Sequence, residues 1–310
     1  MEVNLPVSQV IAIVPTFCPD PDVIERLNAV SSQVSEVIVV DDGSPSSFEP
    51  VLAVFEAAGH TVIRHGANRG IAAALNTGSR KALDDRAEYI LTIDQDTLVP
   101  PGYVDACLKV FDSVVSATNL GVVAVDRIND APSIPPRRSP EGFGLVEEAI
   151  QSGMVISARC LGACGLFDER LFIDCVDTEF CLRVGDHGYR IAIAPGTQIA
   201  HTLGERAPLR PFGIRLASDG IMRTYEYHGP YRRYFIMRNN VDLWLRYRNT
   251  RRGWVLRSIK REFTPTMTTI GSGPQRFRQL LATLIGVAHG LRKVRGPMTK
   301  RVRILLTGRA

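Results

Sequence analysis

The chain has 310 residues, of which 45% are hydrophobic, and its mean hydropathy is +0.02, which excludes both a disordered chain and a membrane protein with several spans. Its net charge of +5 is unevenly distributed: residues 1–205 carry 14 Lys and Arg against 28 Asp and Glu, whereas residues 206–310 carry 23 against 4. We therefore expect a boundary near residue 205, an acidic first part suited to a cation-assisted site, and a basic remainder suited to an anionic partner such as a lipid surface or a nucleic acid.

Short β-rich segments alternate with helical patterns in the first third of the chain. Strands are expected at residues 10–14, 36–40, 61–64 and 89–93. Helices are expected between them, at residues 21–32, 48–58 and 70–83. This alternation predicts βαβ units and a mainly parallel sheet, so the fold class is α/β. In such sheets ligands bind outside the carboxyl ends of the strands, so the residues that follow each strand are the first candidates for a site.

Later segments have a different character. Residues 126–148 are rich in Pro, Gly and Arg and predict a long loop, of the kind that is functional or disordered. Strands are then expected at residues 153–157, 191–194 and 197–200, and a helix at 177–187. After Glu205 the sequence predicts linkers rich in Pro and Arg, then a helix over about 232–248 and an amphipathic helix over about 277–294.

The cellular compartment follows from the N-terminal sequence and the cysteines. No basic stretch followed by an apolar run precedes Val10, so no export signal is expected and the cytosol is the predicted location. The six cysteines are then expected to be small buried residues in a reducing compartment. Cys175, Cys181 and His187 match no zinc-ligand spacing, so no zinc is expected.

Carboxylates follow two of the predicted strands. The second strand ends in Asp41-Asp42-Gly43, and the fourth is followed by Asp94-Gln95-Asp96. Carboxylates one residue apart suit Mg²⁺ or Mn²⁺, which binds through one or two carboxylates together with substrate phosphates and stabilises a departing diphosphate. An alternative for Asp41-Asp42-Gly43 is an Asx turn with glycine at positive φ, and both interpretations can hold together.

The order and spacing of several motifs resemble the inverting GT-A glycosyltransferases of family 2, in particular the bacterial rhamnosyltransferase-like members. The resemblance extends from about residue 10 to about residue 250. The motifs that carry it are residues 13–17 (IVPTF), 39–44 (VVDDGS), 68–78 (NRGIAAALNTG), 91–96 (LTIDQD), 151–153 (QSG), 171–183 (LFIDCVDTEFCLR) and 201–204 (HTLG). It implies a GT-A catalytic domain over residues 1–205, with a donor-binding part at about 8–125 and an acceptor part at about 126–205.

The resemblance also implies roles for individual residues on the donor side. The donor-binding residues would be Pro15, Thr16, Phe17, Asp41, Asp42, Asn68, Arg69, Gly70, Asn76, Asp94 and Gln95. The metal would be held by Asp96 first, then Asp94, with His201 as a further contact to the metal or the diphosphate. Asp42 is alternatively a turn former, and Arg69 is alternatively a solvated cation at a helix start.

The catalytic base is the next expectation. Inversion needs one carboxylate to deprotonate the acceptor hydroxyl, and the resemblance implies Asp177, although Val176 stands where many relatives have Glu. Asp174 and Glu179 are rivals; for Glu179 we favour a helix-start acid paired with Arg183 four residues on. The acceptor side would comprise Gln151, Ser152, Gly153, Asp174, Arg238 and Asn239.

The C-terminal third, residues 206–310, is expected to serve acceptor closure, oligomerisation or membrane-surface association. The stripe Tyr234, Met237, Val241, Trp244 and Leu245 favours core packing. The amphipathic basic helix at about 277–294 is too short to span a bilayer but suits an anionic membrane surface, and a packing or oligomerisation helix is the alternative.

The leading hypothesis is transfer of a sugar, with L-rhamnose from dTDP-L-rhamnose as the best candidate, to a lipid-linked or polysaccharide acceptor at the inner face of the cell membrane. The same chemistry with a UDP-hexose or UDP-N-acetylhexosamine is the first alternative. A sugar nucleotidyltransferase is less favoured because Pro15-Thr16-Phe17 stands where a glycine-rich loop would follow the first strand. A non-catalytic binder of an anionic surface is a third possibility, and a nucleic-acid partner is not expected.

Overall fold

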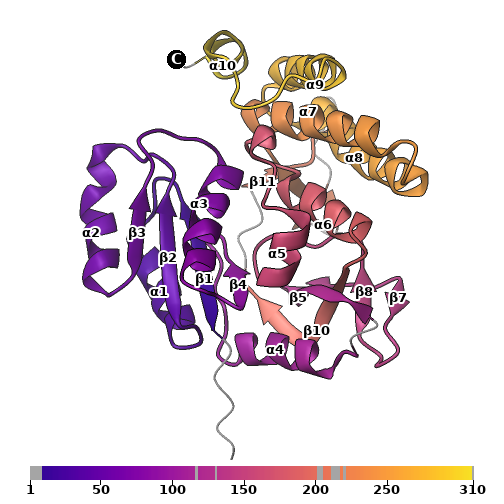
Figure 1. The fold of residues 1–310 in the computed structure, drawn as a ribbon. Helices are drawn as coiled ribbons and strands as arrows, with labels where there is room; N and C mark the ends of the chain where they lie inside the picture. The colour runs from indigo at the N-terminus through magenta and orange to yellow at the C-terminus, as the bar shows by residue number, and fades with distance from the viewer. Residues whose placement is uncertain are drawn as a thin grey trace, which may run out of the picture. The chain divides into compact units, whose positions relative to one another are not determined.

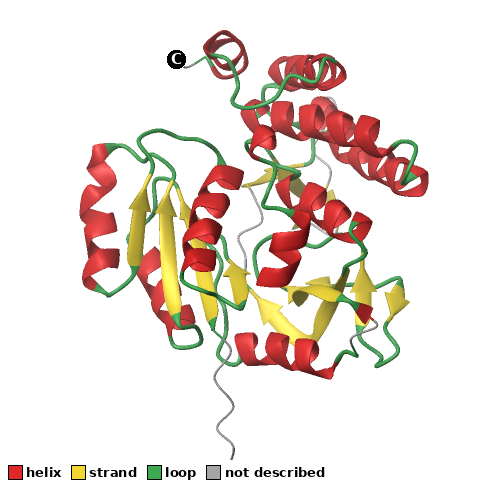
Figure 2. Cartoon of the chain, viewed as in Figure 1, coloured by secondary structure: helices red, strands yellow, loops and turns green. Residues whose placement is uncertain are grey.

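The computed structural model describes residues 9–115, 118–129, 131–200, 205–210, 217–218 and 221–308. The chain divides into two compact units, which are traced in Figures 1 and 2. The first unit comprises residues 1–169 and 176–202, and the second comprises residues 170–175 and 203–310. Each unit is described separately below.

Four parallel strands open the first unit, in the spatial order β3-β2-β1-β4. They are β1 (Val10–Thr16), β2 (Glu36–Asp41), β3 (Thr61–Arg64) and β4 (Tyr89–Thr92), joined by the helices α1 (Val23–Ser31), α2 (Glu49–Ala57) and α3 (Ile71–Asp84). All seven elements were predicted, with ends within two residues of those observed. Strands β1 and β2 are rich in Val and Ile, and β4 contains Ile and Leu, because these three strands are covered on both faces.

The sheet continues beyond β4, and ten strands of the described residues belong to it. Strand β9 (Met154–Ser157) is antiparallel to both β4 and β5 (Leu120–Ile128), while β5 is parallel to β10 (Arg190–Ile199). Three short antiparallel strands complete it: β6 (Ala131–Pro132), β7 (Arg137–Arg138) and β8 (Gly144–Val146). Helices α4 (Tyr103–Ser113), α5 (Ala158–Cys164) and α6 (Val176–Asp186) flank this part.

Two predictions need correction in this part. The strands expected at residues 191–194 and 197–200 form one strand, β10, whose register shifts between Ala194 and Gln198. Residues 126–148 are not a single loop, because they contain the end of β5 and the short strands β6 to β8. The prediction of a mainly parallel α/β sheet is confirmed. Strands β1 to β5 and β10 run in one direction, and β9, which lies between β4 and β5, runs in the opposite direction.

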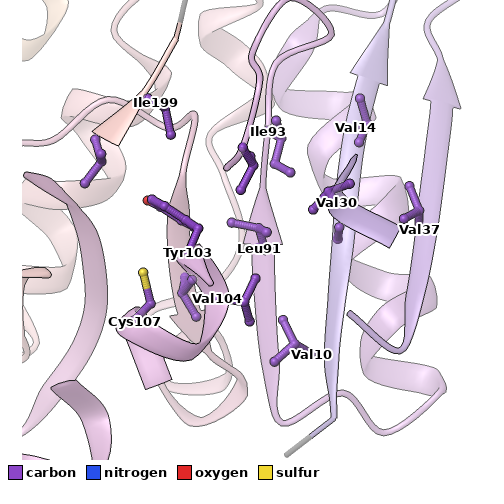
Figure 3. Close-up of a cluster of buried hydrophobic side chains, with 14 of the residues drawn as sticks. Val10, Val14, Val30, Val37, Leu91, Ile93, Tyr103, Val104, Cys107 and Ile199 are labelled. Carbon is purple, nitrogen blue, oxygen red and sulfur yellow. The ribbon is translucent and has the colours of Figure 1, made fainter. Parts of the chain in front are cut away.

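A continuous hydrophobic core lies between the sheet and its helices. Figure 3 shows Val10 and Val14 of β1 near Leu91 of β4, with Val30 and Tyr103 contributed by helices. On α3, small residues allow a close approach to the sheet: a Cβ on Gly78 would lie 2.5 Å from a side-chain carbon of Ile13. The positions of α3 and of the strands therefore depend on tertiary packing as well as on the local sequence pattern.

Helices dominate the second unit. Two strand pairs precede them, β11 (Glu205–Pro208) with β14 (Thr224–Tyr227) and β12 (Ala217–Ser218) with β13 (Ile221–Met222). The helices are α7 (Pro230–Tyr247), α8 (Arg252–Ser272), α9 (Arg276–Leu291) and α10 (Lys300–Thr307). Tyr234 and Phe235 of α7 pack with Phe172, Ala282 and Leu306 in a separate core.

The prediction for this region was partly right. Helices α7 and α9 were expected. In the predicted stripe on α7, Tyr234, Met237 and Val241 are buried, whereas Trp244 and Leu245 are partly exposed. Short strands replace part of the expected linkers, and α8 was not predicted because Pro265 interrupts its pattern. Within the described ranges, no helix is long and apolar enough to cross a bilayer.

Candidate active site

The carboxyl ends of β1, β2 and β4 meet at one edge of the sheet because these strands are parallel neighbours. Asp41, the last residue of β2, pairs in register with Thr16, the last residue of β1. Asp94 follows β4 by two residues, and the intervening Ile93 amide donates to the Ile13 carbonyl oxygen at 3.0 Å. The two groups of acidic residues are therefore presented at the same edge.

Asp41 and Ser44 build the turn after β2. The Ser44 amide donates to Asp41 Oδ2 at 2.9 Å, the Ser44 hydroxyl donates to Asp41 Oδ1, and this hydroxyl accepts from the Cys18 amide at 2.7 Å. Gly43 has a φ of +78°, and a Cβ there would lie 2.3 Å from the Ala67 carbonyl carbon. The predicted Asx turn with glycine at positive φ is confirmed, and it joins the loops that follow β1 and β2.

Asp42 holds the loop that leads into α3. Its carboxylate accepts from the amides of Arg69 at 2.9 Å and Gly70 at 2.7 Å, and its Oδ1 lies 2.8 Å from His65 Nδ1. Asp42 is buried, whereas Asn68 in the same loop is exposed. The turn-forming alternative thus describes Asp42 here, while its contact with a donor stays a prediction. His65 was missed, although it follows β3 directly at the same edge.

Arg69 and Asn76 reach the segment near Glu169. The Arg69 guanidinium is half exposed and lies 3.8 Å from Glu169 Oε2, and Arg80 lies 3.1 Å from Oε1. Asn76 is buried; its amide donates to the Phe167 carbonyl oxygen and to Glu169, both at 2.9 Å, and accepts from the Phe167 amide at 2.8 Å. Burial opposes ionisation of Glu169, but the hydrogen bonds from Asn76 and Arg80 lower its pKa below the ordinary value.

Asp94 is held by the segment that precedes β9. Gln151 Nε2 donates to Asp94 Oδ1, and the Asp94 amide donates to Ser152 Oγ at 3.0 Å. Ser152 Oγ in turn donates to Thr97 Oγ1 at 2.8 Å, and the Gly153 amide donates to the last residue of β4 at 2.7 Å. Residues 151–153 were predicted on the acceptor side, and the structure brings them against the strand end that carries Asp94.

Gln95 ties the loop after β4 to the loop after β1. Its Oε1 accepts from the Phe17 amide at 2.9 Å, its Nε2 donates to the Phe17 carbonyl oxygen at 3.4 Å, and its own carbonyl oxygen accepts from Arg26 at 3.3 Å. Pro15 and Thr16 are buried in β1, whereas the Phe17 ring is 47% exposed. Among the described residues the buried Thr16 hydroxyl has no hydrogen-bond partner.

A divalent cation fits the residue types that follow β4. Asp94 and Asp96 are partly exposed carboxylates one residue apart, and carboxylate oxygens are the ligands that Mg²⁺ and Mn²⁺ prefer. In the described part of the chain, no three His, Cys, Asp or Glu residues cluster as a metal site. A cation that also takes phosphate oxygens and water needs only one or two carboxylates. His201, predicted as a further contact, lies outside the described residues.

Asp177 and Glu179 share the first turn of α6 but differ in environment. Asp177 is partly exposed, and its Oδ1 accepts from the Thr178 amide at 2.7 Å. Glu179 is buried and lies 2.8 Å from the Arg183 guanidinium, which also donates to three carbonyl oxygens at the end of α5. The predicted pairing of Glu179 with Arg183 is confirmed, which makes Glu179 a structural acid.

Asp174, Arg238 and Asn239 belong to the second unit. Asp174 Oδ1 accepts from Arg232 at 2.7 Å. Arg238 and Asn239 are each 1% exposed, and both donate to the Leu171 carbonyl oxygen, at 2.8 and 3.0 Å. These side chains were predicted to reach the acceptor, but the observed contacts hold the backbone of residues 171–174, so an acceptor contact by them stays a prediction.

Comparisons with known proteins give a consistent result. The dTDP-rhamnosyl transferase RfbF of Shigella flexneri is 27% identical over 307 residues, which are 93% of this chain and 97% of that protein. The crystal structure of S. aureus TarS 1-349 in complex with UDP-GlcNAc aligns with a TM-score of 0.58 and 16% identity, covering 96% of this chain and 84% of that chain. The crystal structure of GalNAc-T7 with UDP, GalNAc and Mn²⁺ aligns with a TM-score of 0.53 and 11% identity, covering 64% of this chain and 44% of that chain. These two structural likenesses show the GT-A fold.

The family is shown by the sequence of the first half of the chain. The model of Glycosyl transferase family 2 matches residues 11–172, slightly more than half of the chain. The matched range contains the four parallel strands and the acidic residues that follow β2 and β4. The chain therefore belongs to glycosyl transferase family 2, and it is a nucleotide-sugar glycosyltransferase.

Proposed function

We propose that this enzyme transfers L-rhamnose from dTDP-L-rhamnose, with inversion, to a lipid-linked or polysaccharide acceptor at the inner face of the cell membrane. The observation that carries the proposal is the Asp94-Gln95-Asp96 segment, which follows β4 with Asp94 fixed by Gln151 and Gln95 bonded to Phe17. The choice of donor is supported by the relative RfbF, named a dTDP-rhamnosyl transferase, which aligns along almost its entire length.

The donor diphosphate requires neutralisation as it leaves. A Mg²⁺ or Mn²⁺ ion, when bound, would supply positive charge to the diphosphate oxygens. Asp96 would bind it directly, Asp94 would be the second ligand, and His201 would be a further contact. The reported Mn²⁺ in GalNAc-T7, which shares the fold, supports a divalent ion without selecting which one.

The nucleotide would lie across the carboxyl ends of β1 and β2. Asp41 would accept hydrogen bonds from the base and ribose, and the exposed Phe17 ring would offer an apolar surface to the base. The half-exposed Arg69 guanidinium would pair with the diphosphate, since it stands 3.8 Å from Glu169 and is not tightly bonded to that carboxylate.

Asp177 would act as the base. Its carboxylate accepts the proton of the acceptor hydroxyl while the hydroxyl oxygen forms a bond to the anomeric carbon, and the bond to the diphosphate breaks with its electrons leaving on the phosphate oxygen. One displacement inverts the anomeric centre and needs no covalent intermediate. The partial exposure of Asp177, in contrast to the buried Glu179, supports this choice between the two acids of α6.

The test is a donor screen on the full chain. Thermal shift and donor hydrolysis are measured with dTDP-L-rhamnose, UDP-glucose and UDP-N-acetylglucosamine, each with Mg²⁺, with Mn²⁺ and with EDTA. We expect the largest metal-dependent response with dTDP-L-rhamnose. A preferred response to a UDP sugar would replace the proposed donor, and the lack of any response would contradict the proposal.

Two variants separate the proposed roles. Asp177→Asn should lower turnover by about a hundredfold or more while donor binding persists, since a general base contributes 10²–10⁴ in rate. Asp96→Asn should weaken metal-dependent donor binding as well. The matched control is Asp105→Asn, which removes an exposed carboxylate from α4 of the same unit and should change neither quantity. Full turnover by Asp177→Asn would exclude Asp177 as the base.

A further inference from the structure

Among the described residues, an apolar stripe on helix α9 is exposed. The small residues of this helix pack against α7, as Figure 1 shows for the two helices: a Cβ on Gly286 would lie 2.8 Å from the Tyr234 carbonyl oxygen, so only glycine allows this approach. On the other side, large apolar side chains are exposed at helical spacing. They are Phe277 at 77%, Leu280 at 41%, Leu284 at 58% and Leu291 at 58% exposure. Such a stripe on a helix marks a surface that binds an apolar partner.

The charge of this region limits the choice of partner. Glu262 is the last acidic residue of the chain, and residues 263–310 contain nine Lys and Arg. A second copy that used the same surface would bring two strongly positive faces together, which is unfavourable. An anionic partner with an apolar layer satisfies both the stripe and the charge.

A basic cavity lies at the C-terminal end of the stripe. It has a volume of about 330 Å³ and is lined by Asp242, Leu245, Arg246, Arg248, Leu291, Lys293 and Arg295. Asp242 is the one acid among these lining residues, and it contacts both Arg246 and Arg295, the latter at 3.2 Å. Four cations against one carboxylate leave the cavity with a net positive charge, which suits a phosphate group.

Leu291 connects the stripe and the cavity, since it belongs to both. We propose that α9 docks on an anionic lipid surface, with the stripe inserted among the acyl chains and the basic cavity taking a lipid phosphate. A helix with one apolar face and flanking cations lies in the membrane interface in this way. The inference deepens the proposed function, which places the acceptor at the membrane, but its test depends neither on the donor nor on the reaction.

Vesicle binding of the full chain tests the inference. Sedimentation is measured with phosphatidylcholine vesicles and with vesicles in which a third of this lipid is replaced by phosphatidylglycerol. We expect binding to the anionic vesicles alone, weakened by added salt because salt screens surface charge. Equal binding to both vesicle types, or binding to neither, would overturn the proposal.

Variants test whether the stripe and the cavity are responsible for vesicle binding. Phe277→Ser with Leu284→Ser should lower the vesicle partition coefficient at least about tenfold, because two large apolar side chains are lost from the interface. Lys293→Gln should lower it about fivefold. The matched control is Ile134→Ser, an apolar position in the first unit that is even more exposed, at 88%, and it should change nothing. Thermal unfolding verifies that each variant is folded.

Two further measurements test whether a small anion or a second copy of the chain binds this surface instead of a lipid. Inorganic phosphate is titrated to test the cavity alone; saturable phosphate binding without vesicle binding would indicate a site for a small anion and overturn the lipid proposal. Sedimentation velocity is measured without lipid; self-association that disappears in the Phe277→Ser, Leu284→Ser variant would identify a second copy as the occupant and also overturn it.

Discussion

Replacing Asn239 with Leu tests how the second unit holds the segment before α6. The Asn239 side chain is buried; its Nδ2 lies 3.0, 2.7 and 2.9 Å from the carbonyl oxygens of Leu171, Ile173 and Asp174, and its Oδ1 accepts from Arg238 Nε at 2.9 Å. Leucine has a similar size and makes none of these bonds. Arg238 still donates to the Leu171 carbonyl oxygen, so the groups that lose this partner are the Ile173 and Asp174 carbonyl oxygens and Arg238 Nε. At about 1–3 kcal/mol each, their cost is about 3–9 kcal/mol.

The segment needs this support because its backbone is strained. Phe172, Asp174 and Cys175 have φ values of +68°, +63° and +61°, in the left-handed region that costs a side-chain-bearing residue about 1–2 kcal/mol each. Without the bonds from Asn239, these residues are expected to relax toward negative φ. This relaxation would release part of the strain, so the net loss of stability should lie in the lower part of that range, at about 3–6 kcal/mol.

The assay is urea unfolding followed by tryptophan fluorescence. Trp244 and Trp254 are the two tryptophans of the chain and both lie in the second unit, so the signal reports that unit. With a slope of about 2 kcal/mol per molar urea, we expect the midpoint of Asn239→Leu to fall by about 1.5–3 M. The matched control is Asn240→Leu, since buried Asn240 donates to the Ile236 carbonyl oxygen and accepts from Ser258 Oγ at 3.4 Å, and its loss should cost only about 1–2 kcal/mol. Equal midpoint shifts for the two variants would refute the reasoning.

Three further predictions concern stability. Gly43→Ala should lower the free energy of unfolding of the first unit by more than about 2 kcal/mol, because its Cβ would meet the Ala67 backbone at positive φ; an unchanged melting temperature would contradict this. Asp42→Ala should also lower that temperature, since it leaves the Arg69 and Gly70 amides without their acceptor, whereas Asp105→Ala should not. Burial and two nearby arginines lower the pKa of His289, so protonation favours the unfolded state. Tryptophan fluorescence should show stability of the second unit falling as pH drops below about 6.5, and His289→Gln should remove this fall.

Much of the fold was predictable where local pattern and tertiary packing agree. The strands β1, β2 and β4 are buried on both faces, so apolar residues follow one another in each, mainly Val and Ile in β1 and β2 and Ile and Leu in β4. Strand β9 was predicted as a strand, but its antiparallel direction depends on its pairing with β4 and β5, which its own sequence does not encode. Helix α8 was missed because Pro265 and several threonines interrupt its pattern, and packing overrides this local preference.

The site was predictable in place but not in detail. The rule that ligands bind at the carboxyl ends of parallel strands located Asp41 and Asp94, because this rule depends only on strand order. It could not show that Gln151, far along the chain, donates to Asp94, or that Asn239 holds residues 171–174. A buried asparagine or glutamine that supports a loop and an exposed one that binds a ligand are the same residue type in the sequence, and tertiary contacts alone distinguish them.

The acidic residues of the first unit form two groups that differ in burial and in role. Asp42 and Glu179 are each less than 5% exposed, and their carboxylates bond to backbone amides or to Arg183. These bonds order the loops before a donor arrives, so binding does not have to supply about 1–2 kcal/mol per loop residue to order them. Asp94, Asp96 and Asp177 are partly exposed. Carboxylates that must exchange a proton or bind a cation need access to the ligand. Carboxylates that fix the geometry of a loop are best buried and fully hydrogen-bonded. Such preorganisation keeps the reacting groups in place as charge develops on the diphosphate.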